Sequence, residues 1–289
     1  MSHSWRKPWQ IGLFHDVVWC DTQAGAVLAE RHLQAPASPT PEGLLDELRL
    51  LLGAIDKKKV KPRKVDVLVS DELAAFLTLP WQDALQNQNE IDSYAQIKFE
   101  KNGLVINEEW VMHTEFRDFK AMGNTYAISK SWLQALCSLL AEHQLTLRRV
   151  LPLSAAVIAR QPKPQKNQLN MVLLEERNRI CAVLHAYSGL VAYEVEPVIG
   201  DLVQSRARLL RRVHARFNAI SHIVSWQSRA RSAPQQLESA ELGLFWTTDQ
   251  VDHKASPSMR GWRLFNQFAQ RKTPTKQCQH LTRGHWFPL

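Results

Sequence analysis

The segment VDVLVSDELAAFLTLPW, residues 65–81, decides how the rest of the chain is interpreted. It opens with the apolar run VDVLV from Val65, and a second apolar run ends at Pro80. Ser70 and Asp71, between the two runs, are residue types that favour turns. Short apolar runs separated by turn residues are typical of buried strands, and Pro80 argues against a helix at the end. The segment is therefore predicted to form two buried strands joined by a tight connection.

The composition is that of a globular protein with room for two modest domains. The chain has 289 residues, of which 45% are hydrophobic and 22% are charged. Its formal net charge is +8, which favours an anionic partner such as nucleic acid, an acidic protein surface or an anionic membrane. Solubility alone is the plain alternative explanation of this charge.

The cysteines and the hydropathy pattern indicate where the protein works. The four cysteines lie far apart in or near apolar segments, form no C-x-x-C motif and resemble free buried thiols: Cys20, Cys137, Cys181 and Cys278. Such thiols are typical of a reducing compartment. No signal peptide and no apolar run long enough to span a membrane is visible. We therefore expect a cytoplasmic protein.

The first part of the chain alternates short strands with amphipathic helices. Three strands are predicted within residues 10–14, 17–20 and 26–33, and turn residues separate them. A helix follows, because Thr40 is a good N-cap and Pro41 suits the first helical position. Further elements are predicted as a helix over 88–101, strands over 110–116 and 124–128, a helix from about Ser131 and a strand over 145–151.

A polar, proline-containing stretch, QPKPQKNQ at residues 161–168, is the best linker in the chain. After it the pattern restarts, with three strands at 170–175, 179–187 and 190–196, a helix at 201–219 and a strand at 220–226. A short helix at 235–241, a strand at 242–247 and a helix at 261–270 are predicted beyond these. The predicted organisation is a first half at 1–161, a second half at 168–250 and a basic, aromatic tail at 251–289.

Each half thus opens with a three-stranded meander and then alternates helices and strands. Two such halves across a linker predict an α/β protein with the duplicated ribonuclease-H-like arrangement of the actin-like fold.

Particular motifs carry a resemblance to a known family. They are LVSDELAAFLTLPW at 68–81, KFEKNG at 98–103, the Trp110-Val111 strand, SWLQALCSLL at 131–140 and LRRVLPL at 147–153. With these motifs the chain resembles the PilM and GspL class of actin-like assembly proteins of type IV pili and type II secretion. The resemblance covers residues 65–160 by motif and the remainder by the order of elements. It implies a cytoplasmic scaffold that docks onto inner-membrane and ATPase components of an envelope machine.

Nucleotide binding is not expected. Actin-like ATPases hold phosphates with glycine-containing turns, because backbone N–H groups must approach the anion. The resemblance implies a motif G-[IL]-D-x-G in the first hairpin, as in PilM-type proteins. In the matching stretch, which begins at Gly12, Phe14 stands in place of the aspartate and Asp16 in place of the second glycine. The corresponding stretch of the second half, Glu175-Glu176-Arg177-Asn178, has no glycine and two carboxylates that would repel phosphate. The sequence predicts a pseudo-ATPase with no cofactor.

Other catalytic chemistry finds little support, so no catalytic and no metal-binding residue is predicted. A ribonuclease-H-like nuclease needs carboxylates that converge on metal ions. Six acids at turns or strand ends are available for that role: Asp16, Asp21, Asp66, Asp71, Glu194 and Asp201. Cys278, His280 and His285 have no spacing typical of zinc ligands. No G-x-S-x-G motif of a serine hydrolase occurs.

The helix RARLLRRVHARF, residues 206–217, is the most basic element. Its candidate partner-binding residues are Arg208, Arg211, Arg212 and Arg216, and two aromatic residues of the tail join them, Trp262 and Phe265. Arg208 and Arg212 are predicted to point away from the apolar face of the helix. A solvated helix face, an acidic partner and nucleic acid remain open as explanations, although a single basic stripe lacks the interleaved aromatic residues of single-strand binders.

These observations combine into one functional hypothesis. We expect a non-catalytic, cytoplasmic scaffold that binds an inner-membrane assembly protein through a cytoplasmic peptide and also binds an assembly ATPase. The alternative is a basic nucleic-acid-binding protein, with or without metal-dependent nuclease activity. Steeply salt-dependent binding to random DNA would favour the alternative.

Overall fold

The computed structural model describes residues 8–22, 27–33, 40–55, 63–160, 164–217 and 220–227. The elements predicted at 235–241, 242–247 and 261–270, together with Trp262 and Phe265, lie outside the described residues.

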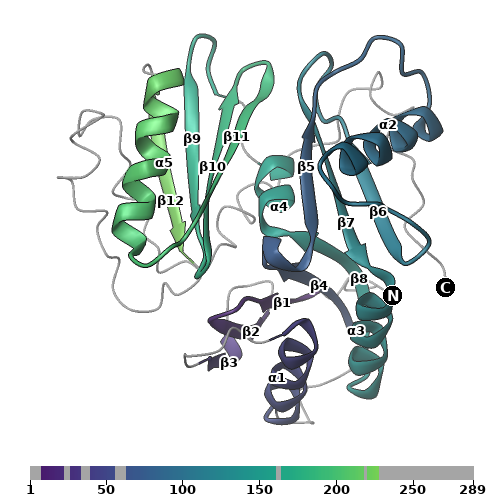
Figure 1. The fold of residues 1–289 in the computed structure, drawn as a ribbon. Coiled ribbons are helices and arrows are strands. Elements are labelled where there is room, and N and C mark those ends of the chain that lie inside the picture. The colour runs from purple at the N-terminus through teal and green to yellow at the C-terminus, as the bar shows by residue number, and fades with distance from the viewer. Residues whose placement is uncertain are drawn as a thin grey trace, which may run out of the picture.

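The first half is built on a five-stranded sheet. Its strands are β1 (Trp9–Leu13), β2 (Val17–Asp21), β3 (Val27–His32), β4 (Arg63–Val69) and β8 (Leu145–Pro152). Their order is β3-β2-β1-β4-β8, with an antiparallel meander followed by parallel pairs. The helices α1 (Pro41–Gly53) and α3 (Lys130–Glu142) pack side by side below this sheet (Figure 1) and bury an apolar core that includes Leu48 and Leu136.

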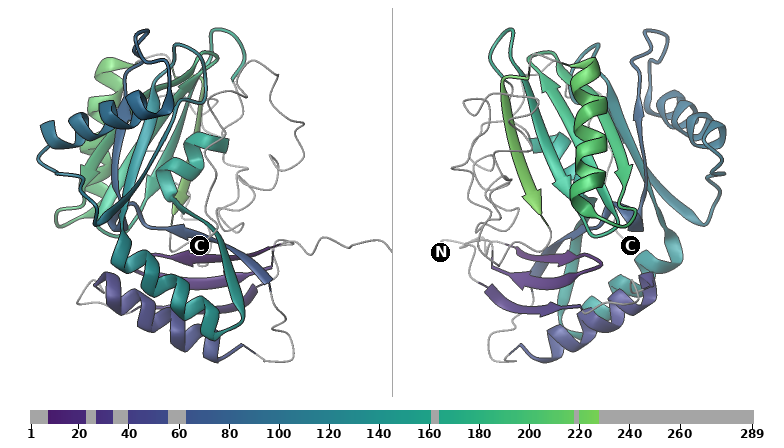
Figure 2. Two further views of the ribbon diagram at one scale, coloured as in Figure 1. Left: turned by 90° about the vertical axis from the view of Figure 1, so that its right-hand side faces the viewer. Right: turned by 60° about the vertical axis from the view of Figure 1, so that its left-hand side comes forward.

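The second half repeats this order. Its strands β9 (Leu169–Glu175), β10 (Arg179–Ala186), β11 (Gly189–Pro197) and β12 (His222–Gln227) lie in the order β11-β10-β9-β12, and β9 and β12 are parallel. Helix α5 (Leu202–Arg216) lies along one face of this sheet (Figure 2). The predicted α/β, actin-like arrangement of two meander-led halves is therefore confirmed within the described residues.

Helix α4 (Leu153–Arg160) joins the two halves and was not predicted. Its buried residues, such as Val157, pack in one core with Phe14 and Leu68 of the first half and Val183 of the second. Because almost every side of α4 is buried, its sequence lacks the alternating polar face that identifies a surface helix.

A third, antiparallel sheet is inserted between β4 and α3. It contains β5 (Ala75–Leu79), β6 (Trp110–Glu115) and β7 (Gly123–Ser129) in the order β5-β7-β6, and α2 (Gln88–Lys101) packs against β5 and β6.

The two strands predicted within residues 65–79 are present as β4 and β5, but the prediction that they pair with each other as a hairpin is wrong. β4 pairs with β1 and β8, whereas β5 pairs with β7 in the third sheet. A short 3-10 helix, Asp71–Leu73, follows Ser70 and leads the chain from one sheet into the other. Of β5, only Leu79 is fully buried.

The proposed domain boundaries at 1–161, 168–250 and 251–289 stay predictions. Among the described helices, none has both the length and the hydrophobicity that a membrane-spanning helix needs.

Gly12 has a structural role, which yields a prediction. It lies on β1 directly opposite Trp19 of β2, and a Cβ at position 12 would lie 2.2 Å from the Trp19 ring. We expect Gly12→Ala to lower the free energy of unfolding by about 1–3 kcal/mol, because the buried ring has to move. Urea denaturation followed by circular dichroism measures this. Gly53→Ala, at the end of α1 where a Cβ meets nothing within 4 Å, is the control. Equal stability of both variants would contradict the prediction.

Candidate functional site at the junction of the halves

The first turn of each half lies at the junction between the halves. Phe14, in the β1–β2 turn, is 1% exposed and belongs to the core that α4 shares with the second sheet. Asp16 in the same turn is also buried. The β9–β10 turn contributes Glu176 and Asn178, and neither turn contains a glycine. Apolar, acidic and amide side chains therefore occupy these two turns.

Glu72, in the 3-10 helix, connects the two turns. Its Oε2 lies 3.1 Å from His15 Nε2 and accepts a hydrogen bond of 3.0 Å from Asn178 Nδ2. Burial acts to raise the pKa of Glu72, but the hydrogen bonds from His15 and Asn178 outweigh it and the pKa lies below its usual value. Glu72 is therefore held as an anion between the halves.

Two buried carboxyl groups meet beside Glu72. The backbone N–H of Asp71 points at Glu176 Oε2, 3.4 Å away. Asp71 accepts hydrogen bonds from the backbone N–H of Ser154 (2.9 Å) and from its hydroxyl (2.5 Å). Burial, together with the charge of Asp71, raises the pKa of Glu176 to about 8. Burial also raises the pKa of Asp71. Because Ser154 donates two hydrogen bonds to Asp71, the anionic form is favoured more at Asp71 than at Glu176.

Arg179 completes the network from the second half. Its guanidinium donates to Tyr193 Oη (2.6 Å) and to Cys181 Sγ (3.2 Å), and Ser154 Oγ lies 3.1 Å from the same tyrosine oxygen. One guanidinium thus accompanies three carboxyl groups at the junction. A phosphate placed here would meet the carboxyl groups of Asp71, Glu72 and Glu176.

The scattered acids do not converge on a metal site in the part of the chain that the structure describes. No group of three or more His, Cys, Asp or Glu is placed to hold a metal ion there. Asp66, for example, forms ion pairs with Arg148 and Arg149 instead.

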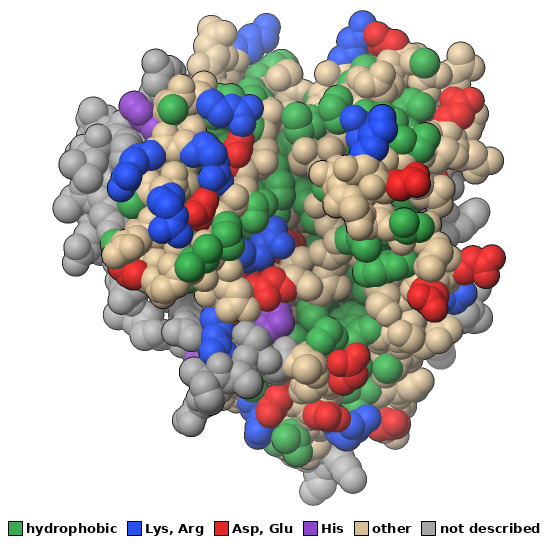
Figure 3. Space-filling view, in the orientation of Figure 1, with side chains coloured by type: hydrophobic (Ala, Val, Ile, Leu, Met, Phe, Trp, Pro, Cys, Tyr) green, Lys and Arg blue, Asp and Glu red, His purple; other side chains and the backbone are tan. Residues whose placement is uncertain are grey.

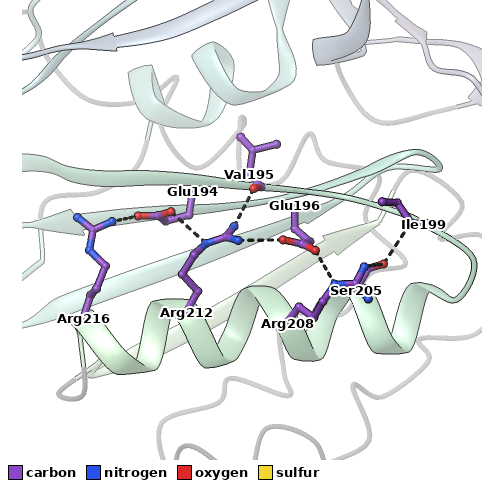
Figure 4. A network of polar contacts seen from close by, with 8 residues as sticks. All are labelled: Glu194, Val195, Glu196, Ile199, Ser205, Arg208, Arg212 and Arg216. Carbon is purple, nitrogen blue, oxygen red and sulfur yellow. Dashed lines mark hydrogen bonds and ion pairs between the residues drawn. The ribbon is translucent and has the colours of Figure 1, made fainter.

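The predicted partner-binding arginines of α5 form a ladder with two glutamates of β11 (Figure 4). Arg208 pairs with Glu196 at 2.7 Å, Arg212 pairs with Glu196 at 2.9 Å and with Glu194 at 3.3 Å, and Arg216 also pairs with Glu194. Arg208 and Arg212 therefore lie along β11, although the sequence analysis placed them pointing away from the packed face. Three of the four candidates are ion-paired within the chain. Whether this face binds a partner stays a prediction.

Arg211 and Arg212 differ in what their side chains contact. Arg211 is exposed, and no described residue pairs with it. Arg212 additionally donates to the backbone carbonyl of Val195 (2.7 Å) on β11, the edge strand of the second sheet. The ladder thus covers part of an edge that would otherwise be open to strand addition.

Arg206 was missed by the sequence analysis. It lies on the buried side of α5, and its side chain is 8% exposed. It forms a two-point ion pair with Glu175, whose side chain is 2% exposed, at N–O distances of 2.6 and 2.9 Å. The signal was present in the sequence, because Arg206 falls on the helix face of Leu209, Leu210 and Val213.

The order of the strands in the two halves is that of the actin-like class of folds. In comparisons with known proteins no family model and no curated protein matches the chain. A solved protein of Bacteroides thetaiotaomicron with an actin-like ATPase fold and unknown function matches with a TM-score of 0.56 at 14% identity, over 87% of this chain and 92% of that one.

Two assembly proteins also match in structure. The PilM–PilN type IV pilus biogenesis complex matches with a TM-score of 0.52 at 14% identity, over 91% of this chain and 94% of that chain. The cytoplasmic domain of EpsL, an inner-membrane component of the type II secretion system of Vibrio cholerae, matches with a TM-score of 0.48 at 12% identity, over 76% and 81%. The predicted resemblance to PilM-type actin-like proteins is confirmed at the level of the fold.

Proposed function

We propose that this protein is a non-catalytic scaffold of a type IV pilus or type II secretion-like envelope machine, where it docks an inner-membrane component and an assembly ATPase. The observation that carries the proposal is the fold shared with PilM, in a complex with PilN, over 91% of this chain. The inserted third sheet and the arginine face of α5 supply surfaces for two partners.

The junction supports the non-catalytic part of this proposal. Phe14 fills the apolar core at one turn, and Asp71, Glu72 and Glu176 place carboxyl groups between the halves. Phosphate binding by an actin-like protein needs free backbone N–H groups at these turns, and a metal-bound phosphate needs space. The backbone N–H groups of Phe14 and Glu176 are instead bonded within their own turns, to the carbonyl oxygens of Val17 and Arg179.

This leads to a prediction for ATP. We expect no saturable binding of Mg·ATP with a Kd below about 1 mM, because the acidic junction repels the triphosphate. Isothermal titration calorimetry on the full chain measures the affinity, and phosphate release measures turnover. A known actin-like ATPase, titrated in the same buffer, is the positive control. Micromolar binding or Mg²⁺-dependent phosphate release would show that the junction opens to nucleotide.

The inner-membrane partner is proposed to contribute a cytoplasmic peptide that adds to the first half. Among the described strands, β3, β8, β5 and β6 lie at sheet edges there. An extended peptide can pair with such an edge through backbone hydrogen bonds. The first three residues of β6, Trp110, Val111 and Met112, combine an edge position with half-buried apolar side chains, which suits recognition of alternate residues.

Cell fractionation tests the adaptor role. We expect the protein to float with inner membranes from its own cells after nuclease treatment and to be released by alkaline extraction, which removes peripheral proteins. A protein that stays in the soluble fraction, or that leaves the membrane fraction when nucleic acid is digested, would contradict the proposal. The nucleic-acid alternative is the weaker candidate, because the PilM–PilN complex shares its fold with 91% of this chain.

A further inference from the structure

The arginine side chains of the ladder are more exposed to solvent than the carboxylates with which they pair. The side chains of Arg208, Arg212 and Arg216 are 41%, 40% and 58% exposed, whereas those of Glu194 and Glu196 are only 15% and 10% exposed. Hydrogen bonds from Arg208 and Arg212 keep the pKa of Glu196 below its usual value, so this carboxylate stays ionised. From solvent the face is therefore cationic although it is internally paired. Lys and Arg side chains gather on this lobe, with hydrophobic atoms beside them (Figure 3).

The spacing of these cations is fixed by the helix. Arg208, Arg212 and Arg216 are four residues apart, which places successive guanidinium groups about 6 Å apart along α5. The glutamates beneath hold the side chains in place, so less rotamer entropy is lost when a ligand binds. Each guanidinium has five N–H donors and uses only some of them within the ladder, as with Arg208 Nε to Glu196 and NH2 to Ser205. Exposed Arg211 adds a cation that no described residue neutralises.

We propose that this face binds an acidic helical segment of a protein partner, with carboxylates at every fourth residue that match the arginine spacing. The proposal rests on the proposed scaffold function and names the chemistry of one partner. A helix that carries Glu or Asp at i, i+4 and i+8 presents carboxylates at the same interval of about 6 Å. Exposed Ile199, whose backbone N–H donates to the Ser205 hydroxyl beside Arg208, adds an apolar contact that favours a protein over a nucleic acid.

The chain's own tail does not fit this face. Residues 251–289 contain a single acidic residue, Asp252, among seven lysines and arginines. Like charges repel, so the charges favour an acidic partner over residues 251–289 as the occupant.

The test uses a labelled alanine-based helical peptide with glutamate at every fourth position, titrated by fluorescence polarisation at low salt. The full-length double variant Arg211→Gln/Arg216→Gln is compared with the wild type; Glu194 keeps Arg212 in this variant. The control, Arg31→Gln/Arg49→Gln, removes two exposed, paired arginines from the first half. We expect the first variant to bind about tenfold more weakly and the control to bind within about twofold of the wild type.

Several outcomes would overturn the proposal. They are equal losses in both variants, equal binding of a scrambled peptide of the same composition, or tighter binding of a random DNA duplex. Capture from cells separates this inference from the scaffold function. If both variants recover an inner-membrane protein and an assembly ATPase as well as the wild type does, the scaffold stands and the ladder is only structural. If the peptide binds as expected but the wild type recovers neither, the scaffold function fails by itself.

Discussion

Replacing Arg206 with alanine is expected to lower the free energy of unfolding by about 3–5 kcal/mol. Arg206 and Glu175 are both almost fully buried, at 8% and 2% exposure, between α5 and the second sheet. Without the guanidinium, Glu175 keeps a charge in an apolar core, where it has lost its solvation and its partner. Urea denaturation followed by circular dichroism measures the loss.

A matched variant on the same helix isolates the effect of burial. Arg208 is also ion-paired, with Glu196, but its side chain is 41% exposed and Arg212 remains as a second partner for that glutamate. Arg208→Ala should therefore cost only about 0–1 kcal/mol. The double variant Arg206→Met/Glu175→Met should recover much of the loss, because an apolar pair leaves no buried charge. Similar losses for Arg206→Ala and Arg208→Ala would contradict the structure of this core.

The second large effect is a dependence of stability on pH that Glu176 controls. Its pKa is raised by burial and by Asp71 from 4.5 to about 8, so between these values the folded protein binds a proton that the unfolded chain has lost. The free energy of unfolding should then fall as pH rises through this window, by about 1.4 kcal/mol per pH unit at most. Asp71 and Glu72 oppose the ionisation of Glu176, and Arg179 favours it.

Glu176→Gln tests this linkage, because glutamine copies the neutral carboxyl group. The variant should lose less stability than the wild type between about pH 5 and pH 8, and it should be the more stable protein at about pH 9. Urea denaturation at a series of pH values measures both curves. Glu108→Gln, in an exposed loop, is the control and should leave the profile unchanged. Parallel curves for Glu176→Gln and the wild type would show that this carboxyl group ionises normally.

Local pattern was enough to predict most of the elements but not every partner of each strand. The two meanders could be predicted because apolar runs alternate with turn residues, as in β9 and β10. The segment from Val65 was misassigned because β5 pairs with β7, which begins 44 residues after Leu79, and no local signal specifies such a partner. Helix α4 was not predicted, because its residues are buried on almost every side and its sequence therefore has no periodic polar face.

The junction shows what sequence alone leaves open. The missing glycines near Phe14 and Glu176 indicated that phosphate binding is not expected, because that argument needs only residue types. The contact of Asp71 with Glu176 joins positions 105 residues apart, so it requires the fold. The pairing of Arg208 and Arg212 with Glu196 likewise depends on how α5 lies on β11.

The central claim, a scaffold for an envelope machine, is tested most directly by affinity capture. The tagged, full-length protein is recovered from detergent-solubilised native cells at moderate salt, with nuclease added, and its companions are identified by mass spectrometry. The account predicts recovery of an inner-membrane assembly protein, an assembly ATPase, or both, unaffected by the nuclease. Recovery of ribosomal or nucleoid proteins alone, lost when nuclease is present, would contradict it and would move attention to the arginines of α5 as nucleic-acid ligands.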